Sequence, residues 1–358
     1  MSAPETGAPN LAQLVRIGLP ALRSRHGHQL TPAHHQALTA IQHCRTGTYG
    51  STLLHCTRCD QRQYQLRSCG HRSCPQCQHH TSQQWLERQQ AKLLPVTYFL
   101  VTFTVPAELR GLCYRNQALA YDCLFRAAAA TLASFGANHK QLNSRLGGCA
   151  VLHTHSRRLD YHPHLHVVVP GGGVNAARKQ FRKLKGRYLF NGRQLATVFR
   201  AKLIDALNRQ GVVLPGGVPK HWVVHCEKVG NGLPALKYLS RYLYRGVIAE
   251  RDIVAYEADR QLVTFRYRDG KTKSDRLLTL PLVEFLWRLM THVLPNGYRR
   301  VRDYGFLHGN AKRLLEIVQL LLRVRLPTRE PRSTRSFRCR DCGQPMTVIG
   351  VIPGWRPT

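Results

Sequence analysis

The feature that most constrains the fold is an alternation of apolar patterns between residues 95 and 250. Short runs rich in β-branched and aromatic residues alternate with longer stretches of helical composition. In chain order, the pattern predicts a strand at 98–105, a helix at 116–135, strands at 149–154 and 164–169, a helix at 193–210, a strand at 221–226 and a helix at 233–245. This order is typical of an α+β domain in which helices pack on one side of an antiparallel-containing sheet, the split-βαβ or ferredoxin-like pattern.

The rest of the chain divides around this α+β domain. Pro20, Gly27 and Pro32 are expected to break the N-terminal residues into short helical pieces, and residues 1–10 are expected to be a disordered lead. The predicted parts are a helical region at 1–43, a zinc-binding module with a linker helix at 44–94, the α+β domain at 95–250, a hairpin and helical region at 251–324, and a basic tail with an isolated Cys pair at 325–358.

The charge balance points to a polyanionic partner. The chain has 53 Lys and Arg residues against 19 Asp and Glu residues, a formal net charge of +34. Nucleic acid is the leading interpretation, because phosphate neutralisation supplies most of such binding. A membrane surface is the alternative, but the sequence has no basic amphipathic helix and no apolar run of about 20 residues. The N-terminus lacks the pattern of a secretory signal, so we expect a cytoplasmic protein that does not bind membranes.

Four of the twelve cysteines form two Cys-x2-Cys pairs, Cys56/Cys59 and Cys74/Cys77. In a reducing compartment such pairs are typical of metal sites, and four thiolates suit a tetrahedral structural Zn²⁺ ion. Buried or redox-active thiols are the alternative, and Cys69 or the nearby His71 could replace one ligand. The module's arginines are expected to contact phosphate: Arg58, Arg62, Arg67 and Arg72.

A third pair, Cys339-x2-Cys342, stands alone near the C-terminus. Two thiolates cannot close a zinc site, so this pair either borrows ligands from elsewhere or is vestigial. The scattered cysteines are interpreted as small core residues: Cys44, Cys113, Cys123, Cys149 and Cys226.

A His-Leu-His sequence, His164 to His166, occupies the predicted strand at 164–169. Residues two apart on a strand share a face, so both imidazoles can bind one divalent cation. His153, eleven residues before His164 on the preceding strand, is the preferred third ligand, with His155 as the alternative. Ordinary surface or core histidines remain the competing interpretation of the pair.

The predicted helix at 233–245 places Tyr238 and Tyr242 on one face, with basic residues on the neighbouring face: Lys237, Arg241 and Arg245. A core aromatic stripe with a solvated basic edge is the alternative. Beside a metal site, phenol oxygens indicate phosphate chemistry, in which a tyrosine attacks phosphorus and leaves a phosphotyrosine and a free 3′-hydroxyl.

A basic segment at 178–193 interleaves Phe181, Tyr188 and Phe190 with cationic side chains. Basic grooves with stacking aromatics are typical of single-strand binding, although a solvated basic loop is the alternative. The residues predicted to contact DNA there are Arg178, Lys179, Arg182, Lys183, Lys185 and Arg187.

Together these motifs give a resemblance over nearly the whole chain. The segments CTRCDQRQYQLRSCGHRSCPQCQ, LLPVTYFLVTFTVPAELR, LHTHSRRLDYHPHLHVVVPGGG and LKYLSRYLYR resemble the two-tyrosine rolling-circle insertion-sequence transposases of the HUH endonuclease class. The resemblance implies that 95–250 is the nuclease domain, that His164 and His166 bind Mg²⁺ or Mn²⁺, and that Tyr238 and Tyr242 are paired nucleophiles. In the related relaxases a third histidine has about the spacing of His153.

The resemblance further implies a bacterial, nucleoid-associated enzyme that acts on single-stranded DNA at element ends, including hairpins. Ser73, where the family often has a larger residue, and the incomplete Cys pair at 339–342 depart from the pattern. Two alternatives remain open: a non-enzymatic zinc-ribbon regulator that binds DNA, and a relaxase or replication initiator with the same chemistry.

Overall fold

The computed structural model describes residues 9–77, 79–186, 188–243, 247–270, 272–324 and 337–355. The chain forms two compact units. The five-stranded unit consists of His80–Leu243 and Leu294–Leu326, and the cysteine-rich unit consists of Met1–His79, Tyr244–Val293 and Pro327–Thr358. Each unit is described by itself below.

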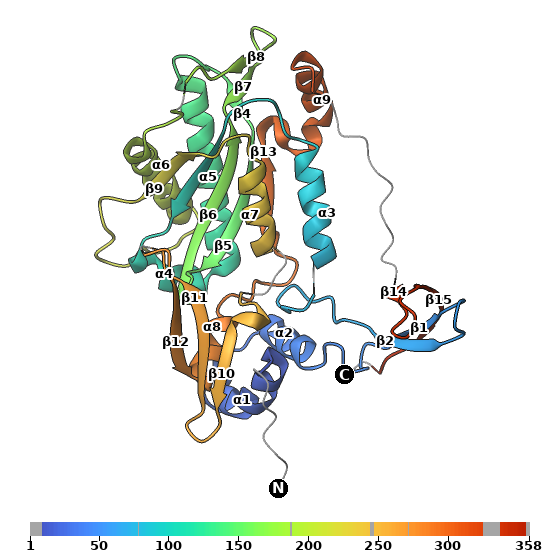
Figure 1. The fold of residues 1–358 in the computed structure, drawn as a ribbon. Helices are drawn as coiled ribbons and strands as arrows, with labels where there is room; N and C mark the ends of the chain where they lie inside the picture. The colour runs from blue at the N-terminus through green and yellow to red at the C-terminus, as the bar shows by residue number, and fades with distance from the viewer. Residues whose placement is uncertain are drawn as a thin grey trace. The chain divides into compact units, whose positions relative to one another are not determined.

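A five-stranded sheet forms the centre of the five-stranded unit, in the order β13-β5-β6-β3-β9 (Figure 1). Its strands are β3 (Tyr98–Thr104), β5 (Gly148–His155), β6 (Tyr161–Pro170), β9 (Val224–Lys228) and β13 (Val301–Tyr304). Each neighbouring pair is antiparallel. Strands β3 and β5 therefore run parallel with β6 between them, and the chain joins them through helices, which is the split-βαβ arrangement. The predicted α+β fold class is confirmed.

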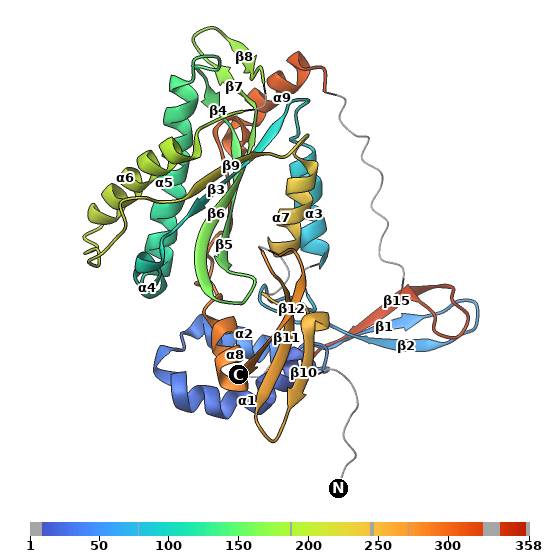
Figure 2. The same cartoon turned by 60° about the vertical axis from the view of Figure 1, so that its left-hand side comes forward.

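Helices α5 (Gln117–Asn138) and α6 (Gly192–Asn208) cover one face of this sheet, whereas α3 (His79–Gln90) and α7 (Leu233–Leu243) lie on its other side (Figure 2). The α5/α6 face holds the apolar core, in which Phe103 of β3 packs against Phe199 of α6 with ring centroids 4.8 Å apart. Leu165 and Val167 of β6 join the same core. Because side chains alternate along a strand, the residues between them point to the α7 side.

The five-stranded unit also contains a small sheet in the order β4-β7-β8. Its strands are β4 (Arg145–Leu146), β7 (Gly172–Asn175) and β8 (Gln180–Lys183), and the unit's remaining helices are α4 (Arg110–Arg115) and α9 (Lys312–Leu321). The sequence pattern did not predict these three strands, nor β13, which adds residues from beyond 250 to the central sheet.

The cysteine-rich unit has a helical part built from α1 (Leu11–His26), α2 (Pro32–Gln42) and α8 (Leu282–Met290), beside a sheet in the order β10-β11-β12. The three strands are β10 (Ile253–Glu257), β11 (Leu262–Arg268) and β12 (Asp275–Pro281), which include the predicted hairpin. The expected break at Pro20 is wrong, since α1 continues through it. Pro20 is exposed, while Leu14, Gly18 and Leu22 are buried, so packing on both sides of the proline holds the helix together.

A second sheet of the cysteine-rich unit has the order β14-β15-β1-β2 (Figure 1). Its strands are β1 (Ser51–His55), β2 (Arg62–Leu66), β14 (Phe337–Arg338) and β15 (Pro345–Ile352). The C-terminal residues, expected as a separate tail, thus pair with the N-terminal cysteine-rich segment. Residues 1–8 and 325–336, part of the predicted lead and tail, lie outside the described residues.

Candidate active site and metal centres

Three histidines meet on the α7 face of the five-stranded sheet. In the antiparallel pairing of β5 and β6, His153 lies opposite His164, and His166 lies opposite Val151. One ligand nitrogen from each of His153, His164 and His166 lies within 4.8 Å of the others. Their ring centroids are 4.6 to 5.3 Å apart. This spacing allows one cation to contact all three imidazoles.

The register of the β5–β6 hairpin separates the two histidines that were predicted as alternative third ligands. A register shift separates His153 from His155, which lies opposite Tyr161 rather than beside His164. The ring of His155 stacks on that of His153 at 6.4 Å, and its Nδ1 lies 3.1 Å from the carbonyl oxygen of Ser156. The structure therefore brings His153, and not His155, into the three-histidine group.

Burial keeps these imidazoles neutral. The pKa of His166 is lowered to about 3, chiefly by burial and further by the positive charge that His164 can carry. Burial likewise holds the pKa of His153 well below its ordinary value and lowers the pKa of His164. A neutral imidazole is the form that binds a metal ion, so at pH 7 protons compete little for this site.

Hydrogen bonds at Nδ1 orient two of the rings. The Nδ1–H of His164 donates to the carbonyl oxygen of His162 at 2.7 Å, which leaves Nε2 with its lone pair. Nδ1 of His166 lies 3.0 Å from the hydroxyl oxygen of Thr102 on β3, the residue directly opposite it in register. Such outer partners fix ring orientation and tautomer in metal sites.

Tyr238 lies next to this group. Its ring centroid is 6.1 Å from that of His166, with the two rings nearly perpendicular, and its side chain is 36% exposed. Helix α7 presents it because Leu236 and Leu239 are buried, which turns Lys237 and Tyr238 to the exposed side together with Arg241. Tyr242 lies one turn further along α7, but its side chain and the whole of Arg245 lie outside the described residues.

Two residues near the site were not predicted from the sequence. Thr102 is one, and Arg300, just before β13, is the other. The backbone carbonyl of Arg300 accepts from the N–H of Leu152, and its guanidinium donates to the carbonyl of Leu243 at the end of α7 at 3.4 Å. The positive charge of Arg300 also contributes to the lowered pKa of His153. Only the strand register, which the pattern does not encode, could have identified either residue.

The basic segment predicted to bind DNA, 178–193, begins in the turn between β7 and β8 and continues through β8 and the following loop to the start of α6. Phe181 packs against Phe306 with ring centroids 5.9 Å apart, and Phe190 is buried, so these two rings belong to the packing of the unit. Tyr188 is 62% exposed. The side chains of Arg178, Lys179, Lys183 and Lys185 are exposed, Arg182 donates to the carbonyl of Leu142 at 3.2 Å, and Arg187 lies outside the described residues.

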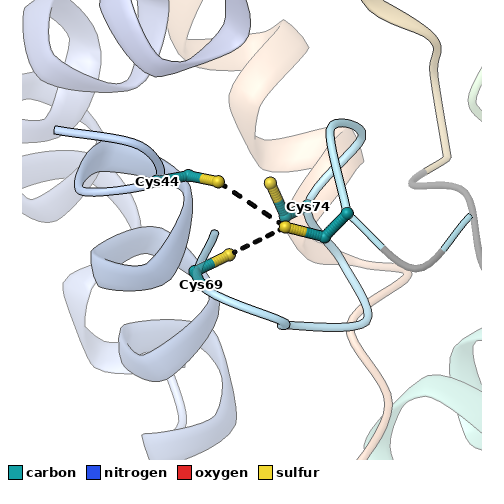
Figure 3. Close-up of side chains that lie close together, drawn as sticks. Cys44, Cys69 and Cys74 are labelled. Carbon is teal, nitrogen blue, oxygen red and sulfur yellow. Dashed lines mark hydrogen bonds between the residues drawn. The ribbon is translucent and has the colours of Figure 1, made fainter. Parts of the chain in front are cut away.

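The predicted zinc ligands divide between two clusters instead of forming one. Cys74 and Cys77 meet Cys44 and Cys69, and Figure 3 shows the side chains of Cys44, Cys69 and Cys74 close together. The Cys77 sulfur lies 3.5 Å from that of Cys44 and 3.5 Å from that of Cys69. Cys44, expected as a core residue, follows α2 and joins the cluster because the helix ends beside the loop after β2. Four thiols at this separation suit a tetrahedral zinc ion.

Cys56 and Cys59 belong to the other cluster, with Cys339 and Cys342. The single site predicted from Cys56, Cys59, Cys74 and Cys77 is therefore wrong as a grouping. Both pairs lie close together in sequence, but β1 and β2 carry the first pair away from the second and toward the C-terminal strands. Cys339 and Cys342 therefore lie beside two further possible zinc ligands, Cys56 and Cys59.

Comparisons with known proteins place the chain in a family. Residues 15–105 match a "Transposase zinc-binding domain", and residues 147–314 match the Y2_Tnp family, described as "Putative transposase". A Sinorhizobium fredii protein named "Putative transposase y4qJ" is 34% identical, over 93% of this chain and 89% of its own length. The chain belongs to this transposase family.

The transposase also has a relative in Pseudomonas savastanoi pv. phaseolicola, the "Transposase for insertion sequence element IS801". That protein is 28% identical over 89% of this chain and 84% of its own. Among solved structures, the conjugative relaxase TrwC in a metal-bound complex with oriT DNA is 15% identical, with a TM-score of 0.29, over 64% of this chain and 73% of that chain. Of the helices that the structure describes in the transposase, none is both long and apolar enough to cross a bilayer.

Proposed function

We propose that this transposase cleaves and rejoins single-stranded DNA at insertion-sequence ends through 5′-phosphotyrosine intermediates. The observation that carries the proposal is the position of Tyr238, whose ring lies beside His166 in a group of three neutral histidines. A DNA-binding regulator has no use for a phenol next to a metal site. The basic charge and the cysteine clusters, by contrast, suit a regulator and an enzyme equally.

The residues of the chain fit a divalent cation at the histidines. His153, His164 and His166 would hold it. When bound, the cation polarises the scissile phosphate and neutralises charge that develops in the transition state. Mg²⁺ prefers oxygen ligands, whereas imidazole suits first-row transition ions, so we infer that Mn²⁺ binds here better than Mg²⁺.

Tyr238 is the proposed nucleophile. Its phenolic oxygen forms a bond to phosphorus as the bond from phosphorus to the 3′ oxygen breaks. The phenol proton leaves to solvent, and the departing 3′ oxygen takes up a proton to become a hydroxyl. The products are a 5′-phosphotyrosine and a free 3′-hydroxyl. Because the phosphodiester bond energy is retained, a 3′-hydroxyl can later attack the phosphotyrosine and rejoin DNA without ATP.

Tyr242 is the proposed second nucleophile, since a residue four positions along α7 lies one turn from Tyr238. Two tyrosines allow one to hold a cleaved 5′ end while the other cuts a second site. Lys237 and Arg241, on the exposed side of α7, and the cations of the β7–β8 hairpin are proposed to neutralise the phosphates of the bound strand.

A covalent-adduct assay tests this function. Single-stranded oligonucleotides carrying the element's ends are incubated with the full chain and Mn²⁺, then resolved under denaturing conditions. A label at the 3′ end should become attached to protein, whereas a label at the 5′ end should appear on a free fragment. EDTA should abolish both products.

Variants assign the nucleophile. Tyr238→Phe should remove the first adduct, and Tyr238→Phe/Tyr242→Phe should remove all adduct. Tyr64→Phe is the matched control, because it removes an exposed phenol to which no role in cleavage or DNA binding is assigned. Adduct formed by the double variant would refute the assignment, and a chain that binds the oligonucleotide without any cleavage would support the regulator.

A further inference from the structure

The two cysteine pairs of the second cluster share a longer sequence pattern. Residues 56–61 read CTRCDQ and residues 339–344 read CRDCGQ, so each segment has the form Cys-x2-Cys-x-Gln. The transposase zinc-binding domain match ends at residue 105 and the other family match ends at residue 314. The C-terminal copy of the pattern therefore lies outside both matches.

The two copies have the same local structure. The backbone N–H of Cys56 donates to the carbonyl of Gln61 at 2.9 Å, and that of Cys339 donates to the carbonyl of Gln344 at 2.8 Å. The residue after the second cysteine has a left-handed backbone in each copy, with φ +58° at Asp60 and +71° at Gly343. Each copy is thus a tight loop that closes a hairpin, β1–β2 in one case and β14–β15 in the other.

The hairpins come from opposite ends of the sequence and join edge to edge. Strand β15 pairs with β1 in antiparallel register from Ser51 opposite Ile352 to His55 opposite Thr347. The Thr347 hydroxyl also donates to the carbonyl of His55 at 3.2 Å. This pairing brings the two loops together at one end of the four-stranded sheet.

The sulfur atoms at this end have the spacing of a metal site. The Cys59 sulfur lies 3.5 Å from that of Cys342 and 3.6 Å from that of Cys339, and the sulfurs of Cys56 and Cys342 are 3.5 Å apart. These distances are far from the roughly 2.05 Å of a disulfide. They approach the edge of about 3.8 Å that a tetrahedron with Zn–S bonds of about 2.3 Å requires. The side-chain amide of Gln63 also points an N–H at the Cys339 sulfur, 3.8 Å away.

The sheet has little else to hold it together at this end. The buried cluster between the hairpins contains Leu54 and Met346 together with Cys56 and Cys339 themselves. Several apolar side chains of β15 are exposed, so the sheet does not bury them as a core would. A small module of this kind usually needs a bound metal to fold.

We propose that the chain holds a second structural zinc ion, bound by Cys56, Cys59, Cys339 and Cys342, in a ribbon assembled from its two ends. The ion joins residues 283 positions apart in the sequence. The last strand is therefore an integral part of the N-terminal cysteine-rich module, and a chain shortened before residue 339 would leave Cys56 and Cys59 with an incomplete site.

Counting metal tests the proposal without depending on DNA cleavage. The full chain is purified with its native metal, and zinc is measured per chain by mass spectrometry. Cys339→Ser/Cys342→Ser should lose one zinc relative to wild type, and Cys56→Ser/Cys59→Ser should lose one. The variant with all four changes should lose one and no more, because both pairs hold the same ion. Cys69→Ser/Cys74→Ser should lose a different ion, so combining it with Cys339→Ser/Cys342→Ser should remove two. Cys226→Ser, outside both clusters, is the control and should lose none.

Cobalt substitution of the wild-type chain keeps the test valid if a serine variant fails to fold. Thiolate-to-cobalt charge transfer reports only sulfur-bound metal, so the histidine site adds nothing to it. Two tetrathiolate cobalt ions per chain are expected in wild type. Cys342→His, which can still ligate zinc, should retain two zinc ions bound to cysteine-containing sites. One tetrathiolate ion per wild-type chain, with the thiols of 56, 59, 339 and 342 open to alkylation, would overturn the proposal.

Discussion

Replacing Thr102 by Val should weaken metal binding without removing any ligand. The Thr102 hydroxyl is the partner of the His166 Nδ1 at 3.0 Å, and valine has nearly the same shape but no hydroxyl. His166 would then lack the contact that sets its ring orientation and tautomer. Loss of such an outer partner typically lowers metal affinity by about 10- to 100-fold, which corresponds to roughly 1.4 to 2.8 kcal/mol.

The measurement is the Mn²⁺ dissociation constant, obtained by calorimetry or from the free-ion paramagnetic resonance signal. Thr104→Val is the matched control. Thr104 lies on β3, as Thr102 does, and is opposite His164 of β6. The Nδ1 of His164, however, is already hydrogen-bonded to the carbonyl oxygen of His162. Thr104→Val should therefore bind Mn²⁺ as wild type does. At saturating Mn²⁺, Thr102→Val should recover most of its cleavage rate. Equal affinity in wild type and Thr102→Val, or equal losses in both variants, would refute the reasoning.

Three further predictions follow from the described contacts. Because burial lowers the pKa of His166 to about 3 in the folded chain, against about 6.5 when unfolded, the unfolded state binds more protons between these values. The free energy of unfolding of the metal-free chain should therefore decrease as the pH falls from about 6.5 to about 3, by up to about 1.4 kcal/mol per pH unit for this one histidine. Denaturant titrations should show a shallower pH dependence for His166→Gln. Gly232→Ala should destabilise the start of α7 by about 1–3 kcal/mol, because φ is +81° at Gly232 and the new Cβ would lie 2.6 Å from the Tyr98 ring. Gly230→Ala is the control: φ is +65° there, but the new Cβ would meet open space. In thermal unfolding, Gly230→Ala should therefore lower stability less than Gly232→Ala does. Tyr188→Ala should weaken single-strand binding by about 1–3 kcal/mol and leave stability unchanged, because this ring is exposed. Phe181→Ala should chiefly lower stability, because this ring packs against Phe306. Lower stability in Tyr188→Ala together with weaker DNA binding in Phe181→Ala would contradict these assignments.

Local periodicity determined much of the five-stranded unit. The strands at 98–104, 148–155 and 161–170 and the helices around them follow apolar patterns that are complete within ten to twenty residues. The shared face of His164 and His166 follows from the same two-residue period. Strand β13 could not be predicted in this way, because its four residues pair with β5 only through a contact across some 150 positions of sequence.

The sequence pattern could not identify which histidine joins His164 and His166. The sequence offered His153 and His155 on the same arm of a hairpin, and either one has the right side chain. The register shift between them removes His155 from the group, and that shift depends on how β5 and β6 pair. The roles of Thr102 and Arg300 depend on pairing and packing in the same way.

The cysteines show most clearly what the sequence determines and what only the tertiary structure determines. The sequence by itself predicted that Cys56/Cys59 and Cys74/Cys77 form metal-binding loops, because the spacing within four consecutive residues suits that geometry. Which pairs lie together was decided only by the tertiary structure. A tetrahedral zinc site needs four ligands in one place and does not depend on their order along the chain. Cys44 follows a helix, and Cys339 and Cys342 come from the far end of the chain. Strand pairing, not proximity in sequence, brings such ligands together.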